Sequence, residues 1–530
     1  MKRKKLWSLL LVAAMSMSLL AGCGGGSGDG GSSSGGDGGN VGGVENAGGG
    51  DAGSSGDGYS TEIDMNEEPY TVAIQVVTLP GTQYEGEEDR EAAINAITVP
   101  AINCKVDIQE IWISEIGNTT SMAIAGNEKI DLVHVATVQP LSGMVGSDML
   151  FDMNQGNLLQ NRGQKLIEVL GDVMGAGYVK GQQLAVPAKN FNATAKGIAY
   201  NKTMADELGI TIPESITFDE LEAILYEVHE KNPDVMAYYT GEGNLNNLFW
   251  LASYESFGSE SAYGVVLDAA SDPTVVNLYE TDMFKDYCLR VQRWTADGIQ
   301  PGDPTDTNSA QDYLGAQKLF CTTVNINPEQ EVVWGSQGAI NGFEMGFAKL
   351  VEPTLTNTAI TEFMWGIASN SERPDKAMDF LNFLYSNAEV ANILKYGLEG
   401  VNYNYVDGSS IVIEKNGSYD PLFYNGGDMR TLLIASPAGE DYVKNLEALE
   451  AQVTPSPLTN YMFDDSNFQT ESSVINSTIL EYLPRLQNGM CASEEETLAL
   501  IDEFNQKLAA SGINDVIAAN QEQVDAYLAQ

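Results

Sequence analysis

The sequence predicts an α/β fold in which strands and helices alternate along the chain. Three short runs are rich in β-branched residues, which favours strands: residues 70–77, 104–108 and 131–135. Two intervening segments have helical composition: residues 87–97 and 114–125. This alternation favours a sheet with crossover connections. About 470 residues follow Gly58, which is long for one hydrophobic core and indicates two or more lobes.

The amino terminus has the features of an export signal. Residues 2–5 are basic, and a mostly apolar run of about 15 residues follows at 6–20. A membrane-spanning helix needs about 20 such residues, so this run is short for a permanent span. The Leu-Ala-Gly-Cys motif that ends at Cys23 resembles the lipobox of bacterial lipoproteins, whose cysteine is acylated and becomes the new amino terminus. We therefore expect residues 1–22 to be a lipoprotein signal peptide and Cys23 to be the lipidation site, modified by palmitate or a similar acyl chain. The alternative is an ordinary signal peptide with a chance cysteine.

A glycine-rich stretch follows the expected lipidation site. About half of residues 24–58 are glycine, with serine, aspartate and asparagine between them. Such a chain buries too little apolar surface to offset its ordering entropy, and it has a root-mean-square reach of roughly 30–35 Å. We expect residues 23–60 to be an acylated cysteine with a disordered linker that holds the body at the extracellular side of the cell membrane.

The amino-acid composition narrows the classes of possible binding partner. The net charge of −47 disfavours nucleic acid, and it is explained either by solubility at a cell surface or by cationic ligands. Four cysteines besides Cys23 show no CxxC spacing, and all three full disulfide pairings stay open for them: Cys104, Cys288, Cys321 and Cys491. With two histidines in the chain, a His/Cys zinc site is nearly excluded. We expect no metal and no cofactor.

Further helices are marked by their amino-terminal signals. Thr217 and Glu220 have capping-box spacing, and an apolar stripe follows: Leu221, Ile224, Leu225 and Val228. Pro374 suits the first turn of a second helix. Ser493 and Glu496 repeat the capping-box spacing near the carboxyl end, where a last helix closes the chain.

Sequence motifs for catalysis are not evident. The one G-x-S-x-G match, at 31–35, falls in the glycine-rich linker without a flanking strand or helix. No phosphate-binding G-x-x-x-x-G-K-[ST] motif occurs. We expect no enzymatic activity. A surface glycosidase remains an alternative, because paired carboxylates need only spatial proximity and leave no motif.

Several short runs, taken in order, resemble the ABC-transporter extracellular solute-binding lipoproteins of family 1, the maltose-binding-like group. They are GQQLAVP (181–187), YNK (200–202), TFDEL (217–221), IASNSERPDKA (367–377) and YGLEGVNY (396–403). The last run, and the residues from Met462 onward, resemble a subgroup with an extra carboxy-terminal domain of undefined function. Four positions depart mildly from the family's usual residues: Gln182, Leu184, Ala185 and Phe218.

The resemblance implies a two-lobe, periplasmic-binding-protein-like type II fold with a hinge and an interlobe cleft, plus a helical carboxy-terminal addition. By analogy, residues 61–186 and 355–394 form the amino-terminal lobe. Residues 187–353 and 395–450 form the carboxy-terminal lobe, and residues 451–530 pack on the lobes.

The implied function is that of a monomeric, lipid-anchored extracellular substrate-binding protein of an ABC importer. It takes a carbohydrate, an oligosaccharide by preference, into the cleft and delivers it to the transmembrane permease by hinge closure. Peptides or amino-acid derivatives are the alternative solutes, and an adhesion or structural lipoprotein is a further alternative.

Sugar sites combine aromatic faces, which contact ring C–H groups, with planar polar groups, which bind hydroxyls. Trp365 is the first candidate because it precedes a strand that runs near the cleft as the chain crosses between lobes. The other expected ligand contacts are Trp250, Tyr254, Glu255, Asn325 and Trp334.

Overall fold

The computed structural model describes residues 58–78, 86–136, 139, 141–190, 192–239, 253–301, 308–414, 419 and 421–529. The chain divides into Met1–Gly58 and Tyr59–Gln530, and the second unit is described here. The predicted signal peptide, Cys23, the linker up to residue 57 and Trp250 lie outside the described residues. Within these ranges, no helix has both the length and the apolar character needed to cross a bilayer.

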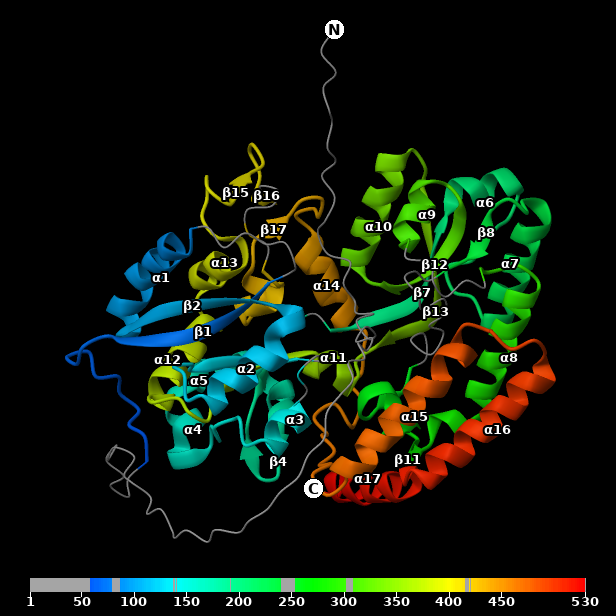
Figure 1. The fold of residues 1–530 in the computed structure, drawn as a ribbon. Helices are drawn as coiled ribbons and strands as arrows, with labels where there is room; N and C mark the ends of the chain where they lie inside the picture. Colours follow the sequence, from blue (N-terminus) through cyan, green and yellow to red (C-terminus); the bar gives the residue numbers. More distant parts are fainter. Residues whose placement is uncertain are drawn as a thin grey trace, which may run out of the picture. The chain divides into compact units, whose positions relative to one another are not determined.

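The first lobe is built on a five-stranded sheet with the order β2-β1-β3-β14-β6. Figure 1 labels β1 and β2 of this sheet, which lie side by side. Its strands are β1 (Tyr70–Thr78), β2 (Cys104–Trp112), β3 (Leu132–Ala136), β14 (Phe363–Ile367) and β6 (Val186–Pro187). β1 pairs in parallel with β2 and β3, whereas β14 pairs antiparallel with β3 and β6. The three strands expected from β-branched content are therefore confirmed. β1 is buried over most of its length, as expected for a parallel strand covered on both faces.

Helices cover this sheet. They are α1 (Glu87–Ile102), α2 (Ile116–Ala125), α3 (Leu141–Gly146), α4 (Leu158–Arg162), α5 (Gln164–Leu170), α12 (Pro374–Leu384) and α13 (Ala388–Tyr396). Pro374 occupies the first turn of α12, as predicted, and the buried face of that helix joins the strands in one core through Ala377, Phe380 and Leu381. A short hairpin of β4 (Tyr178–Val179) and β5 (Gln182–Gln183) leads into β6.

The second lobe is built on a four-stranded sheet with the order β13-β7-β12-β8. Its strands are β7 (Thr194–Asn201), β8 (Met236–Tyr238), β12 (Leu319–Ile326) and β13 (Met345–Thr354). Its helices are α6 (Lys202–Leu208), α7 (Phe218–Lys231), α8 (Asp282–Ala296), α9 (Ala310–Gly315) and α10 (Pro328–Asn341). The predicted capping box at Thr217 and Glu220 is present in full at the start of α7. A second sheet in this lobe joins β9 (Glu255–Ser256), β10 (Val265–Asp268) and β11 (Asp272–Val276).

The chain returns to the first lobe through α11 (Asn357–Thr361), which connects β13 to β14. The next segment differs from expectation, because residues 395–450 were predicted in the second lobe. β15 (Tyr403–Tyr405), β16 (Ile411–Glu414) and β17 (Ile434–Ala435) form a small sheet, and residues 421–427, which precede β17, pack on the first lobe. Asn425 there is fully buried and exchanges hydrogen bonds of 2.8 and 2.9 Å with the backbone of Val77. These bonds hold it at the carboxyl end of β1. Helix α14 (Tyr442–Glu450) follows.

Three helices complete the chain: α15 (Gln469–Gln487), α16 (Glu494–Ala510) and α17 (Ile513–Leu528). They lie beside α8 and β11 (Figure 1) and share one apolar core with the second lobe. Ser493 accepts a hydrogen bond from the Glu496 N–H, as predicted, but the Glu496 carboxylate accepts from Ala492 rather than from Ser493. The second capping box is therefore half formed.

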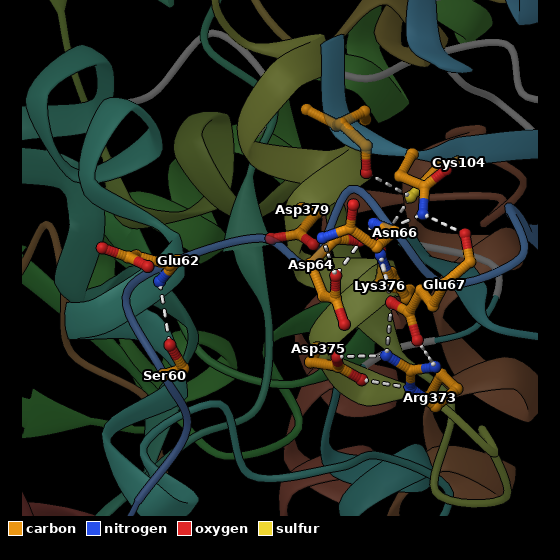
Figure 2. Close-up of polar contacts among 12 residues, drawn as sticks. Ser60, Glu62, Asp64, Asn66, Glu67, Cys104, Arg373, Asp375, Lys376 and Asp379 are labelled. Carbon is orange, nitrogen blue, oxygen red and sulfur yellow. Dashed lines mark hydrogen bonds and ion pairs between the residues drawn. The ribbon is translucent and has the colours of Figure 1, made fainter. Parts of the chain in front are cut away.

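The first described residues form a strap, defined as residues 59–67, that runs against the first lobe. Figure 2 shows its end, where Glu67 binds Lys376 at 2.7 Å and Arg373 at 3.1 Å. Earlier in the strap, the Arg162 guanidinium donates to the Glu62 carbonyl at 2.6 Å, and it also forms a buried ion pair with Asp379. The strap is thus fixed by buried cations of the first lobe.

Candidate functional site

A hollow of about 420 Å³ opens at the carboxyl end of β2 in the first lobe. Its lining combines one indole ring with amides, carboxylates and a hydroxyl: Gln75, Gln109, Glu110, Ile111, Trp112, Glu115 and Thr119. Ligands of open α/β sheets bind outside the carboxyl ends of the strands, because the connecting loops diverge there. The volume falls within the range of about 300–1,000 Å³ found for small-molecule sites.

Trp112 supplies the aromatic surface of the hollow. It is the last residue of β2, and its side chain is half-buried. Its indole N–H is buried and lacks a hydrogen-bond partner among the described residues. A buried N–H without a partner costs free energy, so a ligand oxygen that accepted from it would relieve this cost. The ring and its N–H together suit a ligand with both C–H surface and hydroxyl groups.

The amides at the hollow are held in place by the sheet. Gln75 lies directly opposite Gln109 in the parallel β1–β2 pair. The Gln75 amide donates to the Thr120 hydroxyl at 2.8 Å, and the Gln109 amide donates to Asp107 and to the Lys129 carbonyl, both at 3.1 Å. Each side chain keeps capacity for a further bond, because an amide offers two donor and two acceptor positions.

The negative charge of Glu110 is balanced by a buried arginine, Arg90. Its side chain is only 1% exposed and forms an ion pair with Arg90, whose guanidinium lies 4.0 Å from the Tyr419 ring centroid. Burial raises the pKa of the Glu110 carboxyl, and the Arg90 charge opposes that rise. One of the carboxylates that line the hollow, Glu110, is therefore already paired with an arginine.

In the second lobe, polar groups gather where β7 begins and β12 ends. Lys196 lies directly opposite Asn325 in the antiparallel β7–β12 pair, so both side chains are on one face. Burial lowers the pKa of Lys196 to about 8, and the negative charge of Glu255 opposes the lowering. The Asn325 side-chain oxygen is buried and has no hydrogen-bond partner among the described residues. Two predicted site residues, Glu255 and Asn325, are thus brought to one edge of this sheet, with Lys196 near both.

Glu255 is tied to the connection between the lobes. One carboxylate oxygen accepts from the Asn357 N–H at 3.0 Å, while the other is buried without a partner among the described residues. Burial raises the pKa of this carboxyl, and hydrogen bonds from Ser456 and Asn357 oppose the rise. Since its side chain is almost fully buried, Glu255 interacts at this edge with Lys196 and with the connection rather than with solvent.

The predicted aromatic contacts are placed differently. Trp365 is fully buried in β14, where its ring lies 3.8 Å from the His134 ring, so in this structure it belongs to the first-lobe core and offers no face to a ligand. Trp334 is 5% exposed and packs among Phe343 and other second-lobe core residues. Tyr254 is half-buried, and burial raises its pKa. Trp250 lies outside the described residues.

Trp112 and Gln75 were not among the candidates from sequence. Trp112 ends the observed strand β2, whereas the strand predicted from sequence stopped at residue 108, so a longer prediction of this strand would have placed Trp112 at its carboxyl end. Gln75 carried no such signal, because a polar residue within a buried strand can equally be a satisfied core amide.

Comparison with known proteins agrees with this architecture. Residues 142–391 match the family model described as bacterial extracellular solute-binding protein, and residues 457–529 match a model described as a domain of unknown function (DUF3502). A carbohydrate ABC transporter substrate-binding protein of Streptococcus pneumoniae serotype 4 is 23% identical over 476 residues, which cover 88% of this chain and 92% of that relative. The resemblance to solute-binding proteins predicted from sequence is confirmed: the chain matches the bacterial extracellular solute-binding protein family over residues 142–391 and carries an added carboxy-terminal domain.

Solved structures share the fold. The N-glycan transport solute-binding protein NgtS of Streptococcus pneumoniae superposes with a TM-score of 0.73 at 21% identity, covering 87% of this chain and 99% of that one. A solute-binding protein of Bifidobacterium longum infantis, described as binding human milk oligosaccharides, gives 0.59 at 16% identity, with 87% and 100% covered. The predicted two-lobe α/β fold is therefore confirmed.

Proposed function

We propose that this protein is the substrate-binding component of an ABC importer and that it carries an oligosaccharide. The observation that carries the proposal is the hollow at the end of β2. There the Trp112 ring, whose indole N–H has no partner within the described part of the chain, lies beside the amides of Gln75 and Gln109. An aromatic face with planar polar groups suits a sugar. The relatives described as carbohydrate-binding support the same solute class.

Transport rather than catalysis accounts for the arrangement. A solute that touches both lobes stabilises the state in which they approach each other, by its differential affinity for that state. In the first lobe the contacts would come from Trp112 and the amides, and in the second lobe from Lys196 and Asn325. The closed protein would then dock on a permease and release the solute, with no bond made or broken.

The test is a thermal-shift and calorimetric screen of the purified full chain against oligosaccharides, peptides and amino acids. A ligand at 100 times its dissociation constant adds about 2.7 kcal/mol of stability. We expect an oligosaccharide to raise the melting temperature and to be recovered intact by chromatography. We expect Trp112→Ala to weaken its binding about 10- to 100-fold.

The matched control is Met122→Ala, which removes an exposed apolar side chain on α2 that does not line the hollow. Its affinity should equal that of the unaltered protein. Binding of peptides alone would refute the carbohydrate proposal but leave the transport proposal standing. Cleavage of the sugar during incubation would refute the non-catalytic proposal.

We further propose that Cys23 is acylated and that the protein is held at the outer face of the cell membrane. Support comes from the lipobox sequence and the glycine-rich residues after it. One acyl chain anchors weakly, so stable attachment implies more than one. Cys23→Ala should move the protein from the membrane fraction into the medium, and mass spectrometry of the amino-terminal peptide should lose the acyl mass. Retention of the variant in the membrane fraction would refute the proposal.

A further inference from the structure

The carboxy-terminal domain begins with a short segment that contacts both lobes. We call residues 460–464 the bridging segment. The side chains of Tyr461 and Phe463 are 3% and 7% exposed and belong to the second-lobe core. The Tyr461 hydroxyl donates to the Asn520 side chain at 2.6 Å, and the Phe463 ring lies 5.3 Å from the Tyr263 ring. The odd-numbered residues therefore attach the segment to the second-lobe core and to α17.

The side chains of the even-numbered residues contact the first lobe instead. The Asn460 amide donates to the Asp172 carbonyl at 2.7 Å. Met462 packs against the first-lobe cluster that contains Leu150 and Val179. Asp464 forms an ion pair with Lys180 at 3.1 Å. Alternate side chains of one short segment thus contact opposite lobes, while the Asp464 backbone is hydrogen-bonded to Gln523 of α17.

The bridging segment is also bonded to the connection between the lobes. The Asn357 side chain, at the start of α11, donates 2.8 Å hydrogen bonds to the carbonyls of Thr459 and Tyr461. Asn357 is 6% exposed, and its backbone N–H donates to Glu255. The segment, the crossing connection and the polar edge of the second lobe therefore form one bonded group.

We propose that the carboxy-terminal domain sets the angle between the two lobes, and that Asn460, Met462 and Asp464 determine solute affinity without touching the solute. This rests on the proposed function, because it assigns a role in lobe closure. On the second-lobe side, the bridging segment makes buried aromatic contacts. On the first-lobe side, the described contacts of its side chains are one hydrogen bond, one apolar contact and one partly exposed ion pair. The first-lobe side is the weaker and is the side that changes when the lobes move. The apparent affinity of a binding protein scales with the fraction of molecules in the competent arrangement, so contacts made in only one arrangement shift that affinity.

The first test measures lobe geometry without any solute. Spin labels are placed at Met122→Cys in the first lobe and Ile340→Cys in the second, positions that are 66% and 64% exposed. The described native cysteines are all buried, and Cys23→Ser removes the remaining thiol. We expect the combined variant Asn460→Ala, Met462→Ala, Asp464→Ala to shift or broaden the distance distribution between the labels. An unchanged distribution overturns the proposal.

Matched variants separate lobe geometry from folding. Leu498→Ala alters an exposed residue of the same domain and should leave the distance distribution unchanged. Lys180→Asp should shift the distribution, and adding Asp464→Lys should restore it, because the restored ion pair has the opposite polarity. Failure of this rescue, with the fold intact by circular dichroism, counts against the proposal.

The second test uses the oligosaccharide found in the screen. We expect the combined variant to change its dissociation constant by about 5-fold or more, in line with ordinary coupling between sites. An affinity change with unchanged label distances would overturn the role in lobe geometry. Failure of the proposed function would appear separately, as no binding by the unaltered protein, while the label distances would still respond.

Discussion

The strap at residues 59–67 and the bridging segment at residues 460–464 both cross other elements, yet their contacts differ. The strap is held by one lobe, through cations that are buried: Lys376 has no exposed side-chain surface and Arg162 has 5%. The bridging segment is shared by two lobes, and its ion pair between Lys180 and Asp464 is 38% and 27% exposed. Buried charges are costly to separate, whereas exposed pairs exchange readily with water. The strap therefore suits a fixed attachment, and the bridging segment suits an adjustable one.

The largest expected effect comes from breaking the strap. Arg162→Met leaves the buried Asp379 carboxylate without its cation and removes donors from the Ser60 and Glu62 carbonyls. We expect a loss of about 3–5 kcal/mol in the free energy of unfolding, measured by urea denaturation. The double variant Arg162→Met, Asp379→Leu should recover part of it, since no unpaired charge remains. A loss below about 1 kcal/mol would show that the strap is not held by this pair.

A smaller effect is expected at the bridging segment. Asn357→Ala leaves the buried carbonyls of Thr459 and Tyr461 unpaired, which should cost about 2–3 kcal/mol of unfolding free energy. Hydrogen exchange should also quicken in residues 459–464. Asn387→Ala removes only the cap of α13, where its side chain accepts from Val390, and should cost about 1 kcal/mol. Equal losses of unfolding free energy in the two variants would contradict the prediction that Asn357 stabilises the protein more than an ordinary helix cap does.

The smallest expected effect is a pH dependence of the stability that the strap contributes through Glu67. Hydrogen bonds from Arg373 and then Lys376 lower the pKa of Glu67 to about 2. Because this folded-state pKa lies below the ordinary value near 4.5, the stabilisation is present above about pH 4.5 and is lost as the pH falls toward 2. Solvent screening limits it to about 1 kcal/mol. Glu67→Gln should flatten the stability profile over this window, measured by thermal unfolding.

Glu168→Gln is the control for this pH effect, since its ion pair with Lys165 is exposed on both sides. The stability of this variant should depend on pH in the same way as that of the unaltered protein. If Glu67→Gln kept the full acid-side loss of stability, carboxylates other than Glu67 would be responsible for it.

Local signals predicted the fold well, because their causes lie within a few residues. The strands at 70–77 and 104–108, the cap at Thr217 and the first turn at Pro374 all depend on neighbours in the sequence. The placement of residues 421–435 does not depend on sequence neighbours, because Asn425 binds the backbone of Val77 from a distant part of the chain. No local pattern encodes that bond.

The candidate site was predicted only in part, for the same reason. Asn325 and Glu255 reach one edge of the second lobe, as sheet register and a connecting segment bring them together. Trp365 is buried because β14 inserts between β3 and β6, which is a property of the whole sheet rather than of its own sequence. Trp112 was not a candidate from sequence, since it lies beyond the predicted strand at 104–108, and a strand end becomes a hollow only when the surrounding elements are assembled.

The strap has a mechanical consequence. Any pull on the chain that precedes Tyr59 reaches the first lobe first at Tyr59, which is hydrogen-bonded to Gly156 and Asn161, and only then at the contacts of Arg162 and Glu67. Tension on the amino-terminal side would therefore act on contacts inside the first lobe and would not load the second lobe directly.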